Sequence, residues 1–172
     1  MLHRAPFCIV FVTVFVCFST TAQSCGQVNC VGGTCFQHFN VDLNWKSALN
    51  YCQNISHPNA TLSAIHNAFE DNALITSMGC FADFAWIGLH LVGDSNSAQW
   101  EWADGTPLSY NNWGLNEPKN GTNCAQICHF NFSDQSCVAG KWIGVDCNDT
   151  ENVSCMYANP TIGTTTGLSN NA

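Results

Sequence analysis

The sequence predicts a small, secreted α+β domain that is crosslinked by disulfide bonds and carries one long irregular loop. Two helical patterns come first, at residues 42–55 and 67–79, and short apolar runs typical of strands follow them. Between these runs, residues 93–123 are too polar and too rich in turn-forming residues for regular structure. The chain also holds twelve cysteines in 172 residues, which is typical of a disulfide-bonded secreted domain.

Residues 1–22 have the pattern of a secretory signal peptide. A short basic start that includes Arg4 precedes an apolar run from Phe7 to Phe18, and small residues place the cleavage site after Ala22. The apolar run is shorter than the roughly 20 residues that a membrane-spanning helix needs. We therefore expect a secreted, extracellular protein without a membrane span, and an uncleaved anchor is the alternative.

Two of the twelve cysteines, Cys8 and Cys17, lie in the signal, which leaves ten in the mature chain. An even number of cysteines in an oxidising compartment predicts a disulfide framework of up to five bonds. A zinc site is the alternative, but the mature chain contains no C-x-x-C pair.

Composition excludes several classes of function. The formal net charge is −8 at pH 7, and four Lys and Arg residues cannot supply the phosphate contacts that nucleic acids or anionic membranes require. Enzyme functions are also poorly supported, because no paired carboxylates or His-centred triad show supporting spacing. With all mature cysteines oxidised, a catalytic thiolate is not expected either.

The first half of the domain begins with a cysteine- and glycine-rich stretch at 25–35, which predicts a tight hairpin leading into the first strand. Asp42 is expected to cap a first helix over 42–55. The inward face of this helix carries four residues at helical spacing: Trp45, Ala48, Leu49 and Cys52.

A short buried segment is expected at 61–65. A second helix should then begin after a capping box formed by Asn67 and Glu70 and end near Gly79. Four apolar runs predict the strands of the second half: 84–91, 125–132, 141–145 and 153–157. The tail, 159–172, has almost no core-forming residues and is expected to be disordered.

In order and spacing, the features from about Cys35 to Tyr157 resemble the C-type lectin-like domain family. Four motifs and the cysteines of the first helix and C-terminal end carry the resemblance: Trp86-Ile87-Gly88-Leu89, Trp100-Glu101-Trp102-Ala103-Asp104-Gly105, Asn112-Trp113, Glu117-Pro118-Lys119, Cys52, Cys124, Cys147 and Cys155. The resemblance implies two helices and two small antiparallel sheets with a long irregular loop, over residues 23–158. It also implies that most of the tryptophans are core residues and not a sugar-stacking platform.

The resemblance further implies a disulfide pattern. The family's core pairs correspond to Cys52–Cys155 and Cys124–Cys147. Two additional cysteines flank a hairpin and should pair with each other: Cys128 and Cys137. The family's long form has an N-terminal hairpin bridge, so for the remaining four we expect Cys25–Cys35 and Cys30–Cys80. The swapped arrangement, Cys30–Cys35 with Cys25–Cys80, stays open.

Sugar-binding members of the family hold Ca²⁺ in the long loop, and five positions of this chain correspond to their ligand side chains: Glu117, Lys119, Thr122, Ile143 and Gly144. Only Glu117 keeps a suitable oxygen, although Ca²⁺ needs six to eight. Lys119 places an ammonium where the metal would lie, and such like charges repel by several kcal/mol at an effective dielectric near 20. We therefore predict no calcium and no other cofactor.

The candidate ligand-binding residues are Glu117, Lys119, Asn120 and Asn123. Lys119 is proposed to replace the charge of the metal by pairing with Glu117, and a solvated lysine is the alternative. Nearby side-chain oxygens keep a rearranged calcium site open as a second alternative: Asp94, Asn116, Asn120 and Asn123.

The mature chain contains six N-x-S/T sequons: Asn54, Asn59, Asn120, Asn131, Asn148 and Asn152. In a secreted protein several of them are expected to carry glycans. A glycan at Asn120 would crowd the position of the family's sugar site. Phe130 and Phe132 flank the Asn131 sequon on the additional hairpin.

The resemblance implies a secreted binding module that recognises a carbohydrate or a protein through the long-loop face, without calcium and with a role in innate defence. A residual calcium-dependent lectin is one alternative, and a glycosylated structural or decoy protein without a ligand is another. The sequence encodes no coiled-coil or collagen-like stalk, so we expect a monomer.

Overall fold

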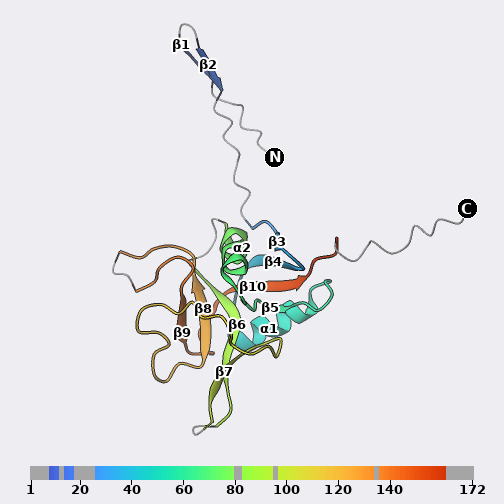
Figure 1. Cartoon of the computed structure of the whole chain (residues 1–172), viewed down its shortest axis with the longest axis vertical. Coiled ribbons are helices and arrows are strands. Elements are labelled where there is room, and N and C mark those ends of the chain that lie inside the picture. Colours follow the sequence, from blue (N-terminus) through green and yellow to red (C-terminus); the bar gives the residue numbers. More distant parts are fainter. Residues whose placement is uncertain are drawn as a thin grey trace, which may run out of the picture.

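The computed structural model describes residues 8–11, 14–17, 26–79, 83–94, 97–133 and 136–161. Most of the predicted signal and most of the predicted tail therefore lie outside the described residues. Within the signal region, strands β1 (Cys8–Phe11) and β2 (Val14–Cys17) pair with each other and with no strand of the main sheet. Figure 1 shows this hairpin apart from the folded domain.

The domain is built on one mixed sheet. Its hydrogen-bonded path runs β3-β4-β10-β6-β8-β9, while β5 pairs with β10 and β7 pairs with β6. The bounds of these strands are as follows: β3 Asn29–Val31, β4 Thr34–Leu43, β5 Thr61–Leu62, β6 Phe84–Val92, β7 Gln99–Trp102, β8 Cys124–Cys128, β9 Trp142–Val145 and β10 Glu151–Ala158. The predicted α+β class is confirmed.

The sheet is more continuous than the two separate antiparallel sheets that the resemblance implied. All ladders are antiparallel except that of β10 with β6, which is parallel and short, pairing Asn152 with Ala85 and Val153 with Trp86. This short ladder joins the two antiparallel parts. The last strand thereby lies between β4 and β6, which places the two ends of the domain side by side (Figure 1).

The first helix, α1, spans Trp45–Asn54, and its cap differs from the prediction. Asn44, and not Asp42, is the N-cap, because its side-chain oxygen accepts a hydrogen bond from the Ser47 N–H at 2.9 Å. Asp42 still belongs to β4, where the chain is extended and pairs with β10, so it cannot start a helix. The predicted inward face of α1 is confirmed as buried.

The second helix, α2, spans Ala68–Met78 and begins at Asn67 as predicted. The Asn67 side-chain oxygen accepts from the N–H groups of Phe69 and Glu70. The Glu70 carboxylate turns back and accepts from the His66 N–H at 2.7 Å, one residue earlier than a standard capping box. Gly79 ends the helix with a positive φ of 62°, a conformation that glycine adopts most easily.

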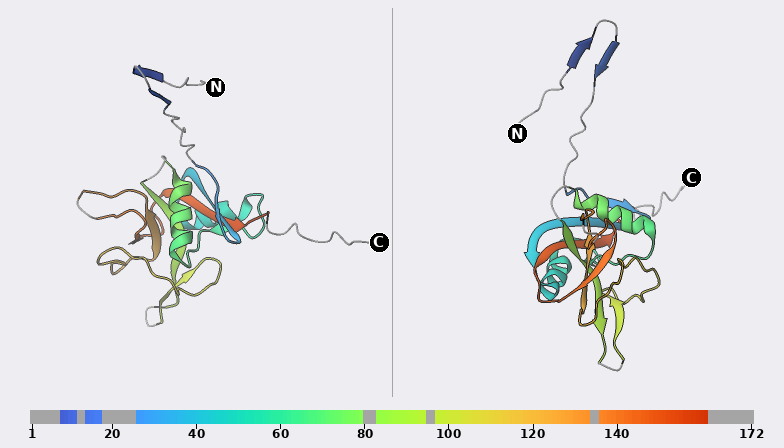
Figure 2. Two further views of the ribbon diagram at one scale, coloured as in Figure 1. Left: turned by 45° about the horizontal axis from the view of Figure 1, so that its top comes forward. Right: turned by 90° about the vertical axis from the view of Figure 1, so that its left-hand side faces the viewer.

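The helices lie on opposite sides of the β4–β10 pair (Figure 2). Leu74 and Met78 of α2 pack with Phe36 into one buried cluster. Trp45 and Leu49 of α1 belong to a second cluster. No helix in the described part of the chain is long and apolar enough to cross a membrane.

Four disulfide bonds join described residues: Cys30–Cys35, Cys52–Cys155, Cys124–Cys147 and Cys128–Cys137. The last three agree with the sequence-based pairs. The expected Cys25–Cys35 and Cys30–Cys80 pairs are wrong, because Cys30 and Cys35 lie directly opposite each other in the β3–β4 ladder. The swapped arrangement accounts for this bond, but Cys25 and Cys80 lie outside the described residues.

The long loop, residues 93–123, is less irregular than the sequence predicted. Strand β7 forms inside it and pairs antiparallel with the end of β6, with Trp102 opposite Leu89. Trp100 and Trp102 alternate with polar Gln99 and Glu101, a strand pattern that the surrounding polar residues concealed. The other described residues of the loop belong to no helix or named strand.

Burial of His38 predicts a pH-dependent stability. The side chain lies in β4 with 5% of the residue exposed, and burial is the main cause that lowers its pKa from 6.5 to about 4. Between these values the unfolded chain binds a proton that the folded chain does not, so the free energy of unfolding should fall as pH falls from 6.5 to 4. The loss reaches about 3 kcal/mol at most.

Denaturant unfolding under non-reducing conditions between pH 4 and pH 7.5 measures this effect. His38→Leu should flatten the pH profile, whereas His57→Leu, which changes an exposed histidine, should leave it unchanged. An equally steep profile in the His38→Leu variant would contradict the assignment.

Candidate functional site

The long loop packs against β9, the last strand on the path of the main sheet. The Gly114 N–H donates to the Trp142 carbonyl at 2.8 Å, and the Trp142 N–H donates to the Asn112 carbonyl at 3.0 Å. Trp113 and Trp142 form a parallel bridge. Residues 112–114 therefore extend the sheet beyond β9 and supply partners for its otherwise unpaired backbone groups.

A buried carboxylate fixes the start of this contact. Asp71 on α2 accepts hydrogen bonds from the Asn112 side-chain amide at 2.9 Å and from the Trp142 indole N–H at 3.1 Å. Lys141 donates to the amide oxygen of Asn112. Burial raises the pKa of Asp71, and the two hydrogen bonds and Lys141 counter that rise. Sequence reasoning identified Asn112 only as part of a motif and missed Asp71, because the two are 41 positions apart.

The aromatic residues beneath the loop belong to the core, as the sequence predicted. Trp86, Trp102 and Trp142 are fully buried. Trp102 and Trp113 each meet the ring of Trp142 edge-on, with centroids 5.3 and 5.9 Å apart. Trp100 and Trp113 are half-buried and form a further edge-to-face pair.

In the Glu117-Pro118-Lys119 triplet, the Glu117 carboxylate is bound by Lys119 and by the backbone of β9. The peptide bond between Glu117 and Pro118 is cis, and the Glu117 side chain is only 4% exposed. Its Oε2 accepts from the Gly144 N–H at 2.9 Å and from the Lys119 N–H at 3.3 Å. The Lys119 ammonium lies 3.2 Å from Oε1, so both carboxylate oxygens are engaged by this chain itself.

Gly144, which corresponds to a calcium-ligand position of the family, has no room for a side chain. A Cβ there would overlap the Thr122 hydroxyl oxygen and would lie 3.0 Å from the Pro118 Cβ. The Thr122 hydroxyl is in turn bound to the Lys119 carbonyl at 2.7 Å. The residues at these positions do not fit a Ca²⁺ ion, because the one carboxylate is neutralised by an ammonium and the others supply no charge. Across the described residues, no three His, Cys, Asp or Glu side chains are grouped to hold a metal.

The other two candidate residues, Asn123 and Asn120, take no part in the contact between Glu117, Lys119 and Gly144. The Asn123 side-chain oxygen accepts from the Cys147 N–H at 3.0 Å, next to the Cys124–Cys147 disulfide. Asn123 therefore fixes the end of the long loop. Asn120 is exposed beside Lys119, where a glycan on its sequon would reach solvent.

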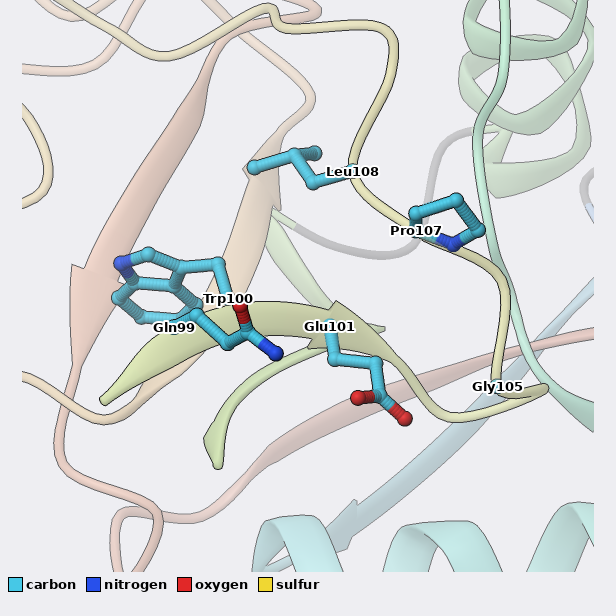
Figure 3. Close-up of a pocket in the computed structure, with 6 residues that line it drawn as sticks. All are labelled: Gln99, Trp100, Glu101, Gly105, Pro107 and Leu108. Carbon is cyan, nitrogen blue, oxygen red and sulfur yellow. The ribbon is translucent and has the colours of Figure 1, made fainter. Parts of the chain in front are cut away.

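A cleft of about 260 Å³ opens between β7 and the segment that follows it (Figure 3). Six residues line it: Gln99, Trp100, Glu101, Gly105, Pro107 and Leu108. Figure 3 shows Trp100 and Leu108 on one side and the Glu101 carboxylate pointing away from them. The side chains of Gln99 and Glu101 form no hydrogen bond with another described residue. The sequence did not predict this cleft, because the strand-like alternation before Gly105 indicates only β7 and not the path of the segment that faces it.

The comparisons with known proteins agree with this architecture. Residues 41–157 match the family model of the Lectin C-type domain. C-type lectin domain family 4 member M from Gorilla gorilla gorilla is 32% identical over 117 residues, which cover 64% of this chain and 30% of that protein. Dromaiocalcin-2 from Dromaius novaehollandiae is 27% identical over 136 residues, which cover 73% of this chain and 89% of that protein.

The solved structure of human lithostathine is similar over 77% of this chain and 97% of its own, with a TM-score of 0.63 and 26% identity. The chain thus spans less than a third of the gorilla protein but most of Dromaiocalcin-2 and lithostathine.

Loss of the Glu117 carboxylate should loosen the long loop more than loss of the Lys119 ammonium. Glu117→Ala leaves the buried Gly144 N–H without its acceptor, at a cost of about 1–3 kcal/mol, and cleavage within residues 114–123 should quicken about tenfold. Lys119 is 72% exposed, so Lys119→Ala should change the rate by less than about fivefold, since such ion pairs contribute at most about 1 kcal/mol.

Limited digestion with a broad-specificity protease measures both effects. Glu101→Ala is the matched control, because it removes a carboxylate that forms no hydrogen bond or ion pair with another described residue. Cleavage of Glu117→Ala at the control rate would show that the carboxylate does not hold the loop.

Proposed function

The chain belongs to the C-type lectin domain family, and on this premise we propose that it is a secreted protein that recognises its ligand through the long-loop face without calcium. The family is a family of carbohydrate-binding domains, and its members are binding proteins and not enzymes. The expectation that this chain is not an enzyme is confirmed by that membership.

The observation that carries calcium independence is the contact between Glu117, Lys119 and Gly144. The Lys119 ammonium lies 3.2 Å from one carboxylate oxygen, and the Gly144 N–H lies 2.9 Å from the other. In a calcium-dependent site the metal would connect the loop to β9. Here one side chain makes that connection directly, so the loop has a means of closure that needs no ion.

Two of the oxygens that would favour a rearranged calcium site are already engaged. The Asp94 carboxylate accepts from the backbone and hydroxyl of Ser97, and the Asn123 oxygen accepts from the Cys147 N–H. These contacts weigh against the residual calcium-dependent lectin as the alternative function.

The β7 cleft supplies the concave part of the long-loop face. Its Gln99 and Glu101 side chains are available for hydrogen bonds, and Pro107 and Leu108 supply apolar surface beside them. A carbohydrate presents both hydroxyl edges and C–H faces, and this mixture matches them. A protein ligand uses the same groups, so the proposal covers a glycan or protein partner.

Secretion is supported by the signal pattern of residues 1–22 and by the four disulfide bonds between described residues, which form in oxidising compartments. We include in the proposal a monomeric state and a role in innate defence, in which the long-loop face binds microbial or cell-surface ligands. The monomeric state is inferred from a sequence without a stalk pattern, and the defence role from the family resemblance.

Binding to a glycan array, with and without a calcium chelator, tests the proposed function. We expect bound glycans to retain their signal within about twofold in chelator, and calorimetry to show no micromolar calcium binding. Glu101→Gln should weaken glycan binding, whereas Asp149→Asn, the same charge change in the turn before β10, should not.

Signals that vanish in chelator would contradict the proposal and favour the calcium-dependent lectin. Silence on the array together with no captured protein partner would contradict it in favour of a structural or decoy glycoprotein.

A further inference from the structure

Three large apolar residues within or next to the loop closed by the Cys128–Cys137 disulfide are exposed. Phe130 is 46% exposed, Phe132 is 36% exposed and Val138 is 41% exposed. We call these three residues the apolar patch. They are half of the large hydrophobic residues that the described structure exposes, and they lie within nine positions of each other. Such a concentration of exposed apolar side chains usually has a covering partner.

Two residues of the patch flank Asn131 in the sequence, and a hydrogen bond fixes the orientation of the Asn131 side chain. The Asn131 side-chain oxygen accepts a hydrogen bond from the Ala139 N–H at 2.9 Å across the loop. The Phe132 N–H donates to the Cys137 carbonyl at 2.9 Å, which holds the two sides of the loop together. Asn131 is exposed, and its side-chain nitrogen makes no hydrogen bond with another described residue. The amide oxygen is therefore bound while the nitrogen is accessible.

We propose that Asn131 carries an N-linked glycan whose first sugars cover the apolar patch. Asn131-Phe132-Ser133 is a sequon, the acceptor sequence for this modification. The Asn131 side-chain nitrogen loses a proton and bonds to C1 of the first sugar, while the lipid diphosphate of the glycan donor leaves, and nothing is oxidised or reduced. The C–H faces of the sugars then pack on the phenyl rings and remove them from water.

The other sequons differ from Asn131 in ways that the structure makes visible. In three of them the side-chain nitrogen is engaged: Asn54 with the Asn50 carbonyl, Asn148 with Asp146 and Asn152 with Asp42. Asn152 is also half-buried in β10 between β4 and β6, and Ser154 of its sequon is fully buried. A glycan at Asn152 would disrupt the centre of the sheet. Asn59 and Asn120 are exposed but are not flanked by the apolar patch.

Site occupancy is the first test. The full chain is expressed in secreting eukaryotic cells, and intact glycopeptides are analysed by mass spectrometry. Asn131 should be occupied in most molecules and Asn152 in almost none. Occupancy at other sequons with a bare Asn131 would overturn the proposal. A chain without any glycan would overturn it together with the secretion on which it rests.

Exposure of the patch is the second test. Ser133→Ala removes the sequon but keeps the Asn131 hydrogen bond to Ala139, so it separates loss of the glycan from loss of the contact. Fluorescence of an apolar dye should rise severalfold in Ser133→Ala and in Asn131→Gln. It should return towards the wild-type level when Phe130→Ser is added to Ser133→Ala.

Ser56→Ala, which removes the Asn54 sequon outside the patch and changes an exposed residue, is the control and should leave dye fluorescence unchanged. Wild-type fluorescence in Ser133→Ala would show that the glycan does not cover the patch, whatever the outcome of the ligand-binding experiments.

Discussion

Strand β10 connects the whole domain, because it lies between β4 and β6 and is joined to α1 by the Cys52–Cys155 disulfide. The bond spans 103 positions, and a crosslink of that span adds about 4–5 kcal/mol to the free energy of unfolding on the chain-entropy model. Because β10 also pairs with β6, the strand that leads into the long loop has a fixed position. The loop can therefore lack regular structure and still present a defined surface.

Two buried carboxylates then attach the loop to β9. Asp71 holds Asn112 and the Trp142 indole, and Glu117 holds the Gly144 N–H. Between these two points, backbone hydrogen bonds pair the loop with Trp142. Burying a carboxylate costs free energy unless its oxygens accept hydrogen bonds. Opening the loop would remove these partners from Asp71 and Glu117, so the closed loop is favoured. The loop is thus held along β9 by contacts of its own side chains and backbone.

The sequence predicted those features that depend on local patterns or on a familiar motif order. Helix faces, the Asn67 cap, most strands and three disulfide pairs follow from spacing and from the family resemblance. Asn44 was missed as a cap because Asp42 is an equally good capping residue, and only the length of β4 decides between them. The contact of Glu117 with Gly144 joins positions 27 apart through a backbone N–H, which has no side-chain signature. The β7 cleft depends on how the chain returns after Gly105, which no pattern specifies.

The lysines limit the chemistry of the ligand that we propose for the long-loop face. Lys119 is paired with Glu117, and Lys141 donates to Asn112 beside Asp71, so both lysines near the loop have structural partners. Glu101 in the cleft has none among the described residues, and the chain as a whole carries a net charge of −8. An anionic ligand would therefore meet repulsion and no free ammonium. The same surface can accept hydrogen bonds from neutral sugar hydroxyls or from a basic protein segment, and these are the ligand classes that its charge favours.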